Sequence, residues 1–175
     1  MKGTTHEEFS KESERRGRIL LKIRVLETFD YSLLERLREH DKREAKVLYN
    51  IDTYEDLETL TTDTLMSAEE SYGIYIEDRL EGAYGVSRHD TVYSPWLFGS
   101  SKLETINSVT FARYSKRVTQ EWFDKYPTLD NHALASYELW RWLGWLGFEV
   151  DILREHLGFP YVLHFYYHNN HHHHK

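Results

Sequence analysis

The residue types most often used in catalysis occur here without the spacing that a known catalytic motif requires. The sequence has no cysteine, which excludes disulfides, thiolate nucleophiles and cysteine-ligated metal centres. It also has no G-x-S-x-G, P-loop or H-E-x-x-H motif, so a serine hydrolase, a P-loop NTPase and a zincin protease find no support. The adjacent carboxylates Glu69–Glu70 and Glu77–Asp78 would not face each other on a helix, and we interpret them as solvated charge.

Histidines gather at the C-terminus, where His168 and His171–His174 could together chelate a divalent metal. A run of this kind at a chain end is more typical of an expression-tag remnant or a mobile tail. We therefore exclude residues 168–175 from the fold and expect no metal cofactor.

Aromatic side chains are the other unusual feature, at 15% of the chain. We expect most of them to build the core, because each ring buries a large apolar area. A stacking surface for bases or sugars is the alternative, but the sequence lacks the accompanying basic side chains that such a surface needs. Trp140, Trp142 and Trp145 cannot all point the same way on a helix, so some of them must face solvent, a cleft or a partner.

The charge balance limits the classes of partner that the protein is expected to bind. The chain has 22 Lys and Arg against 29 Asp and Glu, a formal net charge of -7. This argues against a large sequence-independent nucleic-acid surface, although a local basic patch is compatible with it. The sequence shows no apolar segment typical of a secretory signal or a transmembrane helix, so we expect no membrane partner and a cytoplasmic location.

Apolar periodicity predicts the elements that position these residues. Residues 1–18 are nearly all polar and are expected to form a disordered arm before a domain over residues 19–167. Strands are predicted at 19–26, 73–76, 83–86, 91–98, 129–134, 148–153 and 161–167. Helices are predicted after an N-cap at Asp30, around 54–60, over 63–71, over about 103–125 and over about 136–146.

The order of these elements implies a single α/β or α+β domain, with a mixed sheet flanked by helices. The helix over 103–125 has an apolar stripe at Phe111, Tyr114, Val118 and Trp122. Gly147 follows the helix over 136–146 at the position where a helix end favours glycine.

One segment resembles a known family. Tyr137–Phe148, a short apolar helix closed by Gly-Phe before a strand, resembles the last helix of the GNAT acetyltransferase superfamily, and the element order is similar to that fold. The turn Ser94–Gly99, together with Trp-Leu-Gly-Phe at the end of the helix, resembles a GNAT-like family encoded by short-tailed bacteriophages.

The resemblance implies a binding site for acetyl-CoA, whose pyrophosphate GNAT enzymes hold on backbone N–H groups at the start of the long helix. The equivalent loop, Phe98–Glu104, makes Gly99, Ser100 and Ser101 the candidate cofactor-binding residues, with Ser136 at the start of the later helix. A competing interpretation is that Ser101 and Glu104 form a capping box that closes the same N–H groups.

The resemblance also implies a degenerate catalytic half. Leu143 stands where many family enzymes have the tyrosine that protonates the leaving thiolate, and Ser136 replaces the usual helix-opening asparagine. The central strands offer four residues for a general base: Tyr84, Arg88, His89 and Asp90. His89 and Tyr84 are the catalytic candidates, although a lone histidine beside a turn is commonly a solvated surface residue.

We therefore expect a phage-encoded GNAT-fold protein with a degenerate acetyltransferase site, acting in virion assembly or in the internal virion machinery. Phage or host proteins would be its partners, in the host cytoplasm or in the virion. The alternative is an active acetyl-CoA-dependent N-acyltransferase that modifies a host protein or a small amine. A third hypothesis is an interaction module that uses its aromatic face.

Overall fold

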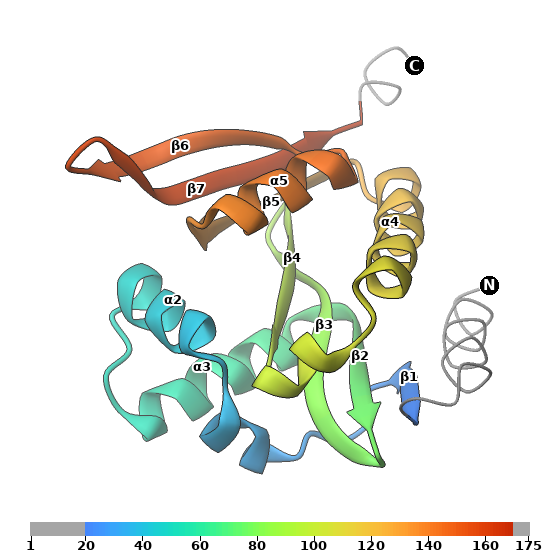
Figure 1. Cartoon of the computed structure of the whole chain (residues 1–175). Coiled ribbons are helices and arrows are strands. Elements are labelled where there is room, and N and C mark those ends of the chain that lie inside the picture. The colour runs from blue at the N-terminus through green and yellow to red at the C-terminus, as the bar shows by residue number, and fades with distance from the viewer. Residues whose placement is uncertain (1–19, 170–175) are drawn as a thin grey trace.

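The computed structural model describes residues 20–169 and is shown in Figure 1. The expected arm at residues 1–18 and positions 170–175 of the expected tail lie outside the described residues. The elements are β1 (Leu21–Val25), the 3₁₀ helix η1 (Tyr31–Arg36), α2 (Glu39–Tyr49), α3 (Tyr54–Met66), β2 (Ala68–Ile76), β3 (Arg79–His89), β4 (Val92–Gly99), the 3₁₀ helix η2 (Ser101–Thr105), α4 (Ser108–Lys125), β5 (Thr128–Leu134), α5 (Tyr137–Leu146), β6 (Glu149–His156) and β7 (Phe159–His168).

Within residues 20–169 the strands form two antiparallel sheets. The first has the order β1-β2-β3-β4 and the second the order β5-β7-β6. β4 and β5 contact each other without sharing a backbone ladder, so the single mixed sheet expected from the sequence is divided at this point. The α+β class and the single domain are confirmed.

The main core lies between these sheets and the helices α4 and α5. Tyr114, Val118 and Trp122 of the expected stripe on α4 are buried, and Phe111 is packed against the same core. α5 begins at its N-cap Ser136, whose side chain accepts a hydrogen bond from the Leu139 N–H. It ends at Gly147, which adopts the left-handed conformation with φ of 115°. Both ends were predicted correctly.

The expected start of the long helix is wrong. η2 occupies Ser101–Thr105, with Ser100 and not Ser101 as its N-cap, and α4 begins only at Ser108. The reason is Asn107, whose side-chain oxygen accepts from the N–H groups of Val109 and Thr110 and closes the true N-terminus of α4. The capping box expected at Ser101 and Glu104 is therefore replaced by two separate caps.

The segment between β1 and β2 also differs from expectation. Asp30 does cap a helix, but that helix is the short η1, and the charged helix α2 follows it. α2 buries Asp41 and Ala45, a pattern with too little apolar periodicity to be recognised in the sequence. The helix expected over 63–71 does not form, because α3 ends at Met66 and β2 begins at Ala68.

Candidate functional site

The site is built around the place where β4 and β5 lie side by side and then part. The side-chain amide of Asn131 on β5 donates to the Pro95 carbonyl of β4 at 2.7 Å. The rings of Tyr93 and Tyr126 pack at 4.9 Å near the beginnings of the same two strands. These contacts hold the strands together without a ladder, which leaves the backbone groups at their C-terminal ends to be paired by another element.

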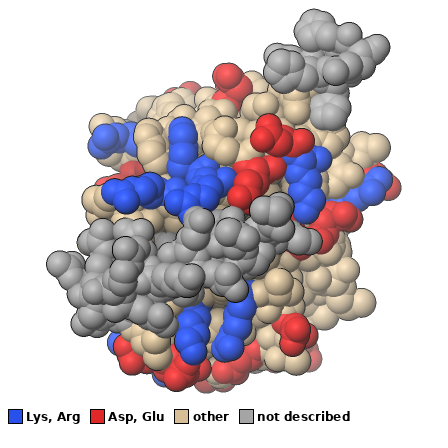
Figure 2. Space-filling model, turned by 90° about the vertical axis from the view of Figure 1, so that its right-hand side faces the viewer, with Lys and Arg blue, Asp and Glu red and all other residues tan. Residues whose placement is uncertain are grey.

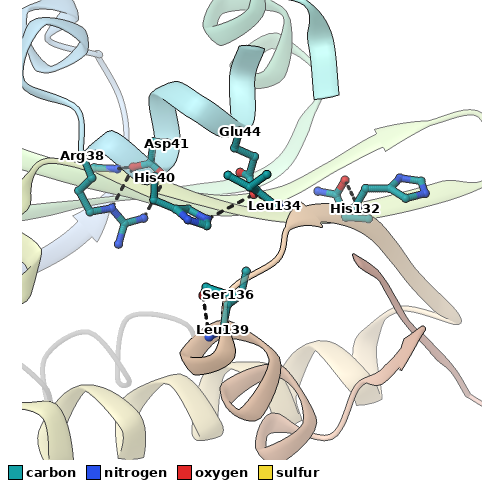
Figure 3. A network of polar contacts seen from close by, with 10 residues as sticks. Arg38, His40, Asp41, Glu44, His132, Leu134, Ser136 and Leu139 are labelled. Atoms are coloured by element: carbon teal, nitrogen blue, oxygen red, sulfur yellow. Dashed lines mark hydrogen bonds and ion pairs between the residues drawn. The ribbon is translucent and has the colours of Figure 1, made fainter. Parts of the chain in front are cut away.

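That element is α2, whose carboxylates bridge the two strand ends. Asp41 accepts a hydrogen bond from the Gly99 N–H at the end of β4, at 2.9 Å. Glu44, one turn further along the helix, accepts from the Leu134 N–H at the end of β5, also at 2.9 Å. Figure 3 shows α2 over this region, with Glu44 above Leu134 and Asp41 toward the beginning of the helix.

The Asp41 carboxylate is almost fully buried and is paired on both oxygens. Arg38 donates to Oδ2 from Nε and to Oδ1 from Nη2, each at 3.0 Å, so the pair is bidentate. The Arg38 backbone N–H donates to the Gly99 carbonyl at 2.9 Å. The end of β4 is thus bonded to α2 through both of the backbone groups of Gly99.

Ser100 is paired just as completely. Its N–H donates to the Glu81 carbonyl at 2.8 Å, and its hydroxyl donates to the Glu81 carboxylate at 2.7 Å. The same hydroxyl accepts from the Lys102 N–H as the cap of η2. A second buried carboxylate therefore stands beside the loop in which the sequence predicts phosphate binding.

The four cofactor-binding candidates occupy three environments. Gly99 and Ser100 lie together against the Asp41 and Glu81 carboxylates, and Ser101 is exposed at the start of η2. Ser136 lies at the start of α5, facing α2 across the end of β5 in Figure 3. Its hydroxyl is used in capping, since it accepts from the Leu139 N–H at 3.1 Å.

The two catalytic candidates lie at different places on β3. Tyr84 is buried in the core, where its hydroxyl is hydrogen-bonded to that of Tyr114, and burial raises its pKa well above the usual value. His89 is exposed at the far end of the β3–β4 hairpin, opposite Val92, whereas Gly82 is opposite Gly99. His89 lies seven residues beyond Gly82 on β3, which corresponds to about 23 Å at about 3.3 Å per residue.

Leu143 is fully enclosed in the core between α5 and the strands, at 3% exposure. Arg88 and Asp90, the remaining candidates for a general base, bond to each other at the same hairpin end as His89, through the Arg88 Nε and the Asp90 carbonyl. The structure thus brings Gly99 and Ser100 together with carboxylates, and it places His89, Arg88 and Asp90 at the opposite end of the β3–β4 hairpin.

Sequence reasoning missed a pair of histidines on the C-terminal sheet. His164 on β7 is hydrogen-bonded through Nε2 to the Asp130 carboxylate on β5 at 2.9 Å, and its ring stacks on that of His132 at 5.0 Å. Partial burial, together with the neighbouring His164, lowers the pKa of His132, which favours its neutral form at pH 7. His132 directly follows Asn131, so this pair lies beside the contact between β4 and β5.

The sequence signal that could have indicated the two histidines is the alternation of side chains between the two faces of β5 and β7. Asp130 and His132 are two residues apart on one strand, as are His164 and Tyr166 on the other, so each pair shares one face of its strand. The register that places His132 opposite His164 is set by tertiary pairing. Among residues 20–169, no group of three or more His, Asp or Glu side chains is placed to hold a metal ion.

No helix in the described part of the chain has the length and apolar character needed to cross a membrane. No protein-family model matches the sequence, and no curated protein matches it significantly.

Solved structures, by contrast, match most of the chain. An acetyltransferase from Bacillus subtilis in complex with CoA has a TM-score of 0.53 at 13% identity, over 85% of this chain and 98% of that one. A GNAT-family acetyltransferase from Bacillus anthracis has a TM-score of 0.52 at 12% identity, over 86% and 95%. A spermidine N-acetyltransferase from Vibrio cholerae in complex with CoA and spermine has a TM-score of 0.53 at 13% identity, over 86% and 96%.

At identities this low the likeness concerns the fold. The divided sheet, the element order and these neighbours agree with one another and confirm the fold that the sequence predicted. Residues 20–169 have the fold of the GNAT N-acetyltransferases.

Proposed function

We propose that this chain is a GNAT-fold protein whose acyl-CoA site is closed by its own helix α2, so that transferase activity is reduced or absent. The observation that carries the proposal is the bridge from α2 to the two strand ends: Asp41 on the Gly99 N–H and Glu44 on the Leu134 N–H. The protein would then act through interactions with other proteins.

The bridge opposes cofactor binding in two ways. Backbone N–H groups that already donate to carboxylates are not available to the pyrophosphate or the pantetheine arm of a coenzyme. The carboxylates of Asp41 and Glu81, which form ion pairs with Arg38 and Arg36, also occupy the space beside the loop. The N-terminus of α4, the other source of N–H groups, is capped by the side chain of Asn107.

Two positions considered for proton transfer support the same proposal. Leu143 has no ionisable group, and Tyr84 is held in the core by Tyr114. A GNAT fold without these functions would serve as a scaffold. The resemblance of Ser94–Gly99 to a family of short-tailed bacteriophages favours virion assembly or the internal virion machinery as the setting, with phage or host proteins as partners.

Thermal denaturation with acetyl-CoA tests the proposal. A ligand at 100 times its dissociation constant stabilises the folded state by about 2.7 kcal/mol, which is a shift of several degrees. We expect no saturable shift for the wild-type protein, and no acetylation of spermine or of a lysine peptide. A saturable shift accompanied by product formation would show that the site is open and would overturn the proposal.

Matched substitutions on α2 sharpen this test. Glu44→Gln removes a charge at the strand ends and keeps an oxygen that can accept from Leu134, whereas Glu39→Gln removes a charge from an exposed position on the same helix. If charge at the bridge excludes the coenzyme, only the first variant gains affinity for acetyl-CoA. Gly99 is unsuitable as a test position, because a Cβ there would lie 2.6 Å from the Glu81 carbonyl oxygen and disturb the fold.

The His164–Asp130 pair supports a second candidate function, an active acyl-CoA-dependent N-acyltransferase. A carboxylate that orients a histidine is the usual arrangement of a general base. In this scheme α2 moves off the strand ends, and Gly99, Ser100 and Ser101 bind the coenzyme. The acceptor amine attacks the thioester carbonyl, its proton passes to the imidazole, and the C–S bond breaks to release CoA thiolate, which takes that proton. Acetylation that is lost in His164→Gln and retained in His89→Gln would establish this function in place of the first.

A further inference from the structure

The helix that closes the strand ends contributes little to the apolar cores. α2 buries Asp41 and Ala45, and none of its eleven residues belongs to either of the two apolar clusters within residues 20–169. α4, by contrast, supplies Val118 and Trp122 to the main cluster. Because burial of apolar side chains is the largest favourable term in folding, the attachment of α2 is weaker than that of α4.

Hydrogen bonds to the strand ends hold α2 in place. The Gly99 N–H donates to Asp41, and the Leu134 N–H donates to Glu44. At the start of the helix, the Arg38 N–H donates to the Gly99 carbonyl. A hydrogen bond within a protein replaces hydrogen bonds to water, so its net contribution to stability is small. An element attached in this way opens at a lower free energy than the core of the same protein.

The two ends of α2 differ in how they are held. Leu37, just before the helix, is buried in the second apolar cluster and forms a β-bridge with Ser100, so it anchors the chain there. Asn50, just after the helix, is exposed and adopts the left-handed conformation with φ of 56°. An isolated helix of eleven residues is marginal in water. Detachment of α2 and unwinding of its backbone are therefore one event.

We propose that α2 is a lid, which detaches and unwinds as one unit while both sheets stay folded. Its opening frees the N–H groups of Gly99 and Leu134 together, although these residues lie in different sheets. This role rests on the proposed function, in which α2 closes the acyl-CoA site, and it makes that closure reversible. A ligand that needs these N–H groups binds only to the open form, so its affinity is reduced by the open fraction.

Hydrogen exchange of individual backbone amides, measured by NMR on the full chain without ligand, tests the lid. We expect the amides of Ala45, Gly99 and Leu134 to have similar opening equilibrium constants, at least about a hundredfold larger than that of Leu163. Leu163 is fully buried on β7, the central strand of its sheet, and its exchange reports opening of the sheet itself. Low concentrations of urea should accelerate the exchange of Leu163 more strongly, because its opening exposes more surface.

Matched glycine substitutions distinguish a lid from opening of the whole molecule. Arg43 is exposed within α2 and Gln120 is exposed within α4, and glycine weakens either helix by a similar amount. Arg43→Gly should raise the opening constants of Gly99 and Leu134 by about threefold to fivefold. Gln120→Gly should leave both unchanged, because α4 stays folded when the lid opens. Both substitutions should raise the opening constant of Leu163, because each destabilises the complete fold.

The two substituted helices lie on opposite sides of the molecule. In Figure 1, α2 lies at the left and α4 at the right, and Figure 2 shows the face that carries α4, where acidic and basic side chains are both exposed. Gln120→Gly leaves the charge of this face unchanged. Arg43→Gly removes a charge, and Arg43→Ala is its control, because alanine removes the same charge and keeps the helix propensity. Gly99 and Leu134 should exchange in Arg43→Ala as they do in the wild type.

Two results would overturn the lid. Equal effects of Arg43→Gly and Gln120→Gly on Gly99 and Leu134 would show that these N–H groups open only with the whole fold. No effect of either substitution would show that each N–H group opens by itself, without α2. Because no coenzyme is present, neither result depends on whether acetyl-CoA binds. A saturable thermal shift with acetyl-CoA and product formation would overturn the proposed function alone.

Discussion

The two sheets of this molecule use their polar side chains in opposite ways. On the N-terminal sheet, the Glu70 carboxylate of β2 is enclosed by donors, and Tyr84 of β3 is bonded to Tyr114 inside the core. On the C-terminal sheet, Asp130 and His164 are paired on a face that solvent reaches, at 34% and 28% side-chain exposure. Glu70 and Tyr84 of the first sheet therefore stabilise the fold, whereas Asp130 and His164 of the second sheet are accessible for chemistry or binding.

Glu70 gives the largest expected effect in this comparison. The sequence predicts solvated charge at Glu70, and this prediction is wrong. The Glu70 side chain is 8% exposed and accepts hydrogen bonds from Tyr72, Trp122, Lys125 and Tyr126. Glu70→Ala would leave several buried donors without an acceptor, and we expect a loss of about 3–5 kcal/mol in the free energy of unfolding. Urea denaturation measures this loss.

Glu69→Ala is the control, since Glu69 is the adjacent and exposed carboxylate on the same strand. It should change stability by no more than about 0.5 kcal/mol. Similar losses in the two variants would show that the enclosure of Glu70 does not stabilise the first sheet.

Acid sensitivity is the next expected effect. Burial alone would raise the pKa of Glu70, but hydrogen bonds from Tyr126, Lys125 and Tyr72 outweigh it and leave the pKa lowered. A lowered carboxyl pKa stabilises the folded state at pH values above the ordinary Glu range, and this stabilisation is lost as the pH falls through the lowered value. Unfolding free energies measured from pH 7 to pH 3 should therefore decline.

Glu70→Gln should show a shallower decline over the same range, because its amide does not titrate. If the unfolding free energy of Glu70→Gln falls with pH as steeply as that of the wild type, other carboxylates cause the acid sensitivity. The two sheets would then not differ in how their stability depends on pH.

The exposed pair on the second sheet should give the smallest effect on stability. Asp130→Asn and His164→Gln each alter a partly exposed hydrogen bond that solvent can replace, so we expect a change below about 1 kcal/mol at pH 7. Thermal denaturation measures it. A loss as large as that of Glu70→Ala would mean that both sheets depend equally on their polar pairs.

Local patterns predicted most of the fold. The caps at Asp30 and Ser136, the stripe on α4 and the glycine that ends α5 are signals within a few residues of one another, and each was identified correctly. The failures have the same origin. α2 was missed because it buries only Asp41 and Ala45, which form no apolar stripe. The start of α4 was misplaced because Ser100 caps a separate 3₁₀ helix and Asn107 caps α4 itself.

The candidate site was less accessible to sequence reasoning. For the loop at Gly99 and Ser100 the sequence predicts coenzyme binding, which stays a prediction, in competition with a capping box at Ser101 and Glu104 that does not form. The groups that pair this loop are instead Asp41 and Glu81, distant in sequence. The histidine pair on β5 and β7 was missed for the same reason, since strand pairing places residues together that no local pattern connects.

Sequence patterns alone predicted most of the elements and the GNAT-like fold, because side-chain periodicity and capping act over a few residues. The tertiary structure alone decided how the backbone N–H groups at the ends of β4 and β5 are paired, and that His132 and His164 lie against each other. Those outcomes depend on contacts between segments far apart in the chain, where burial makes every polar group find a partner whichever element supplies it.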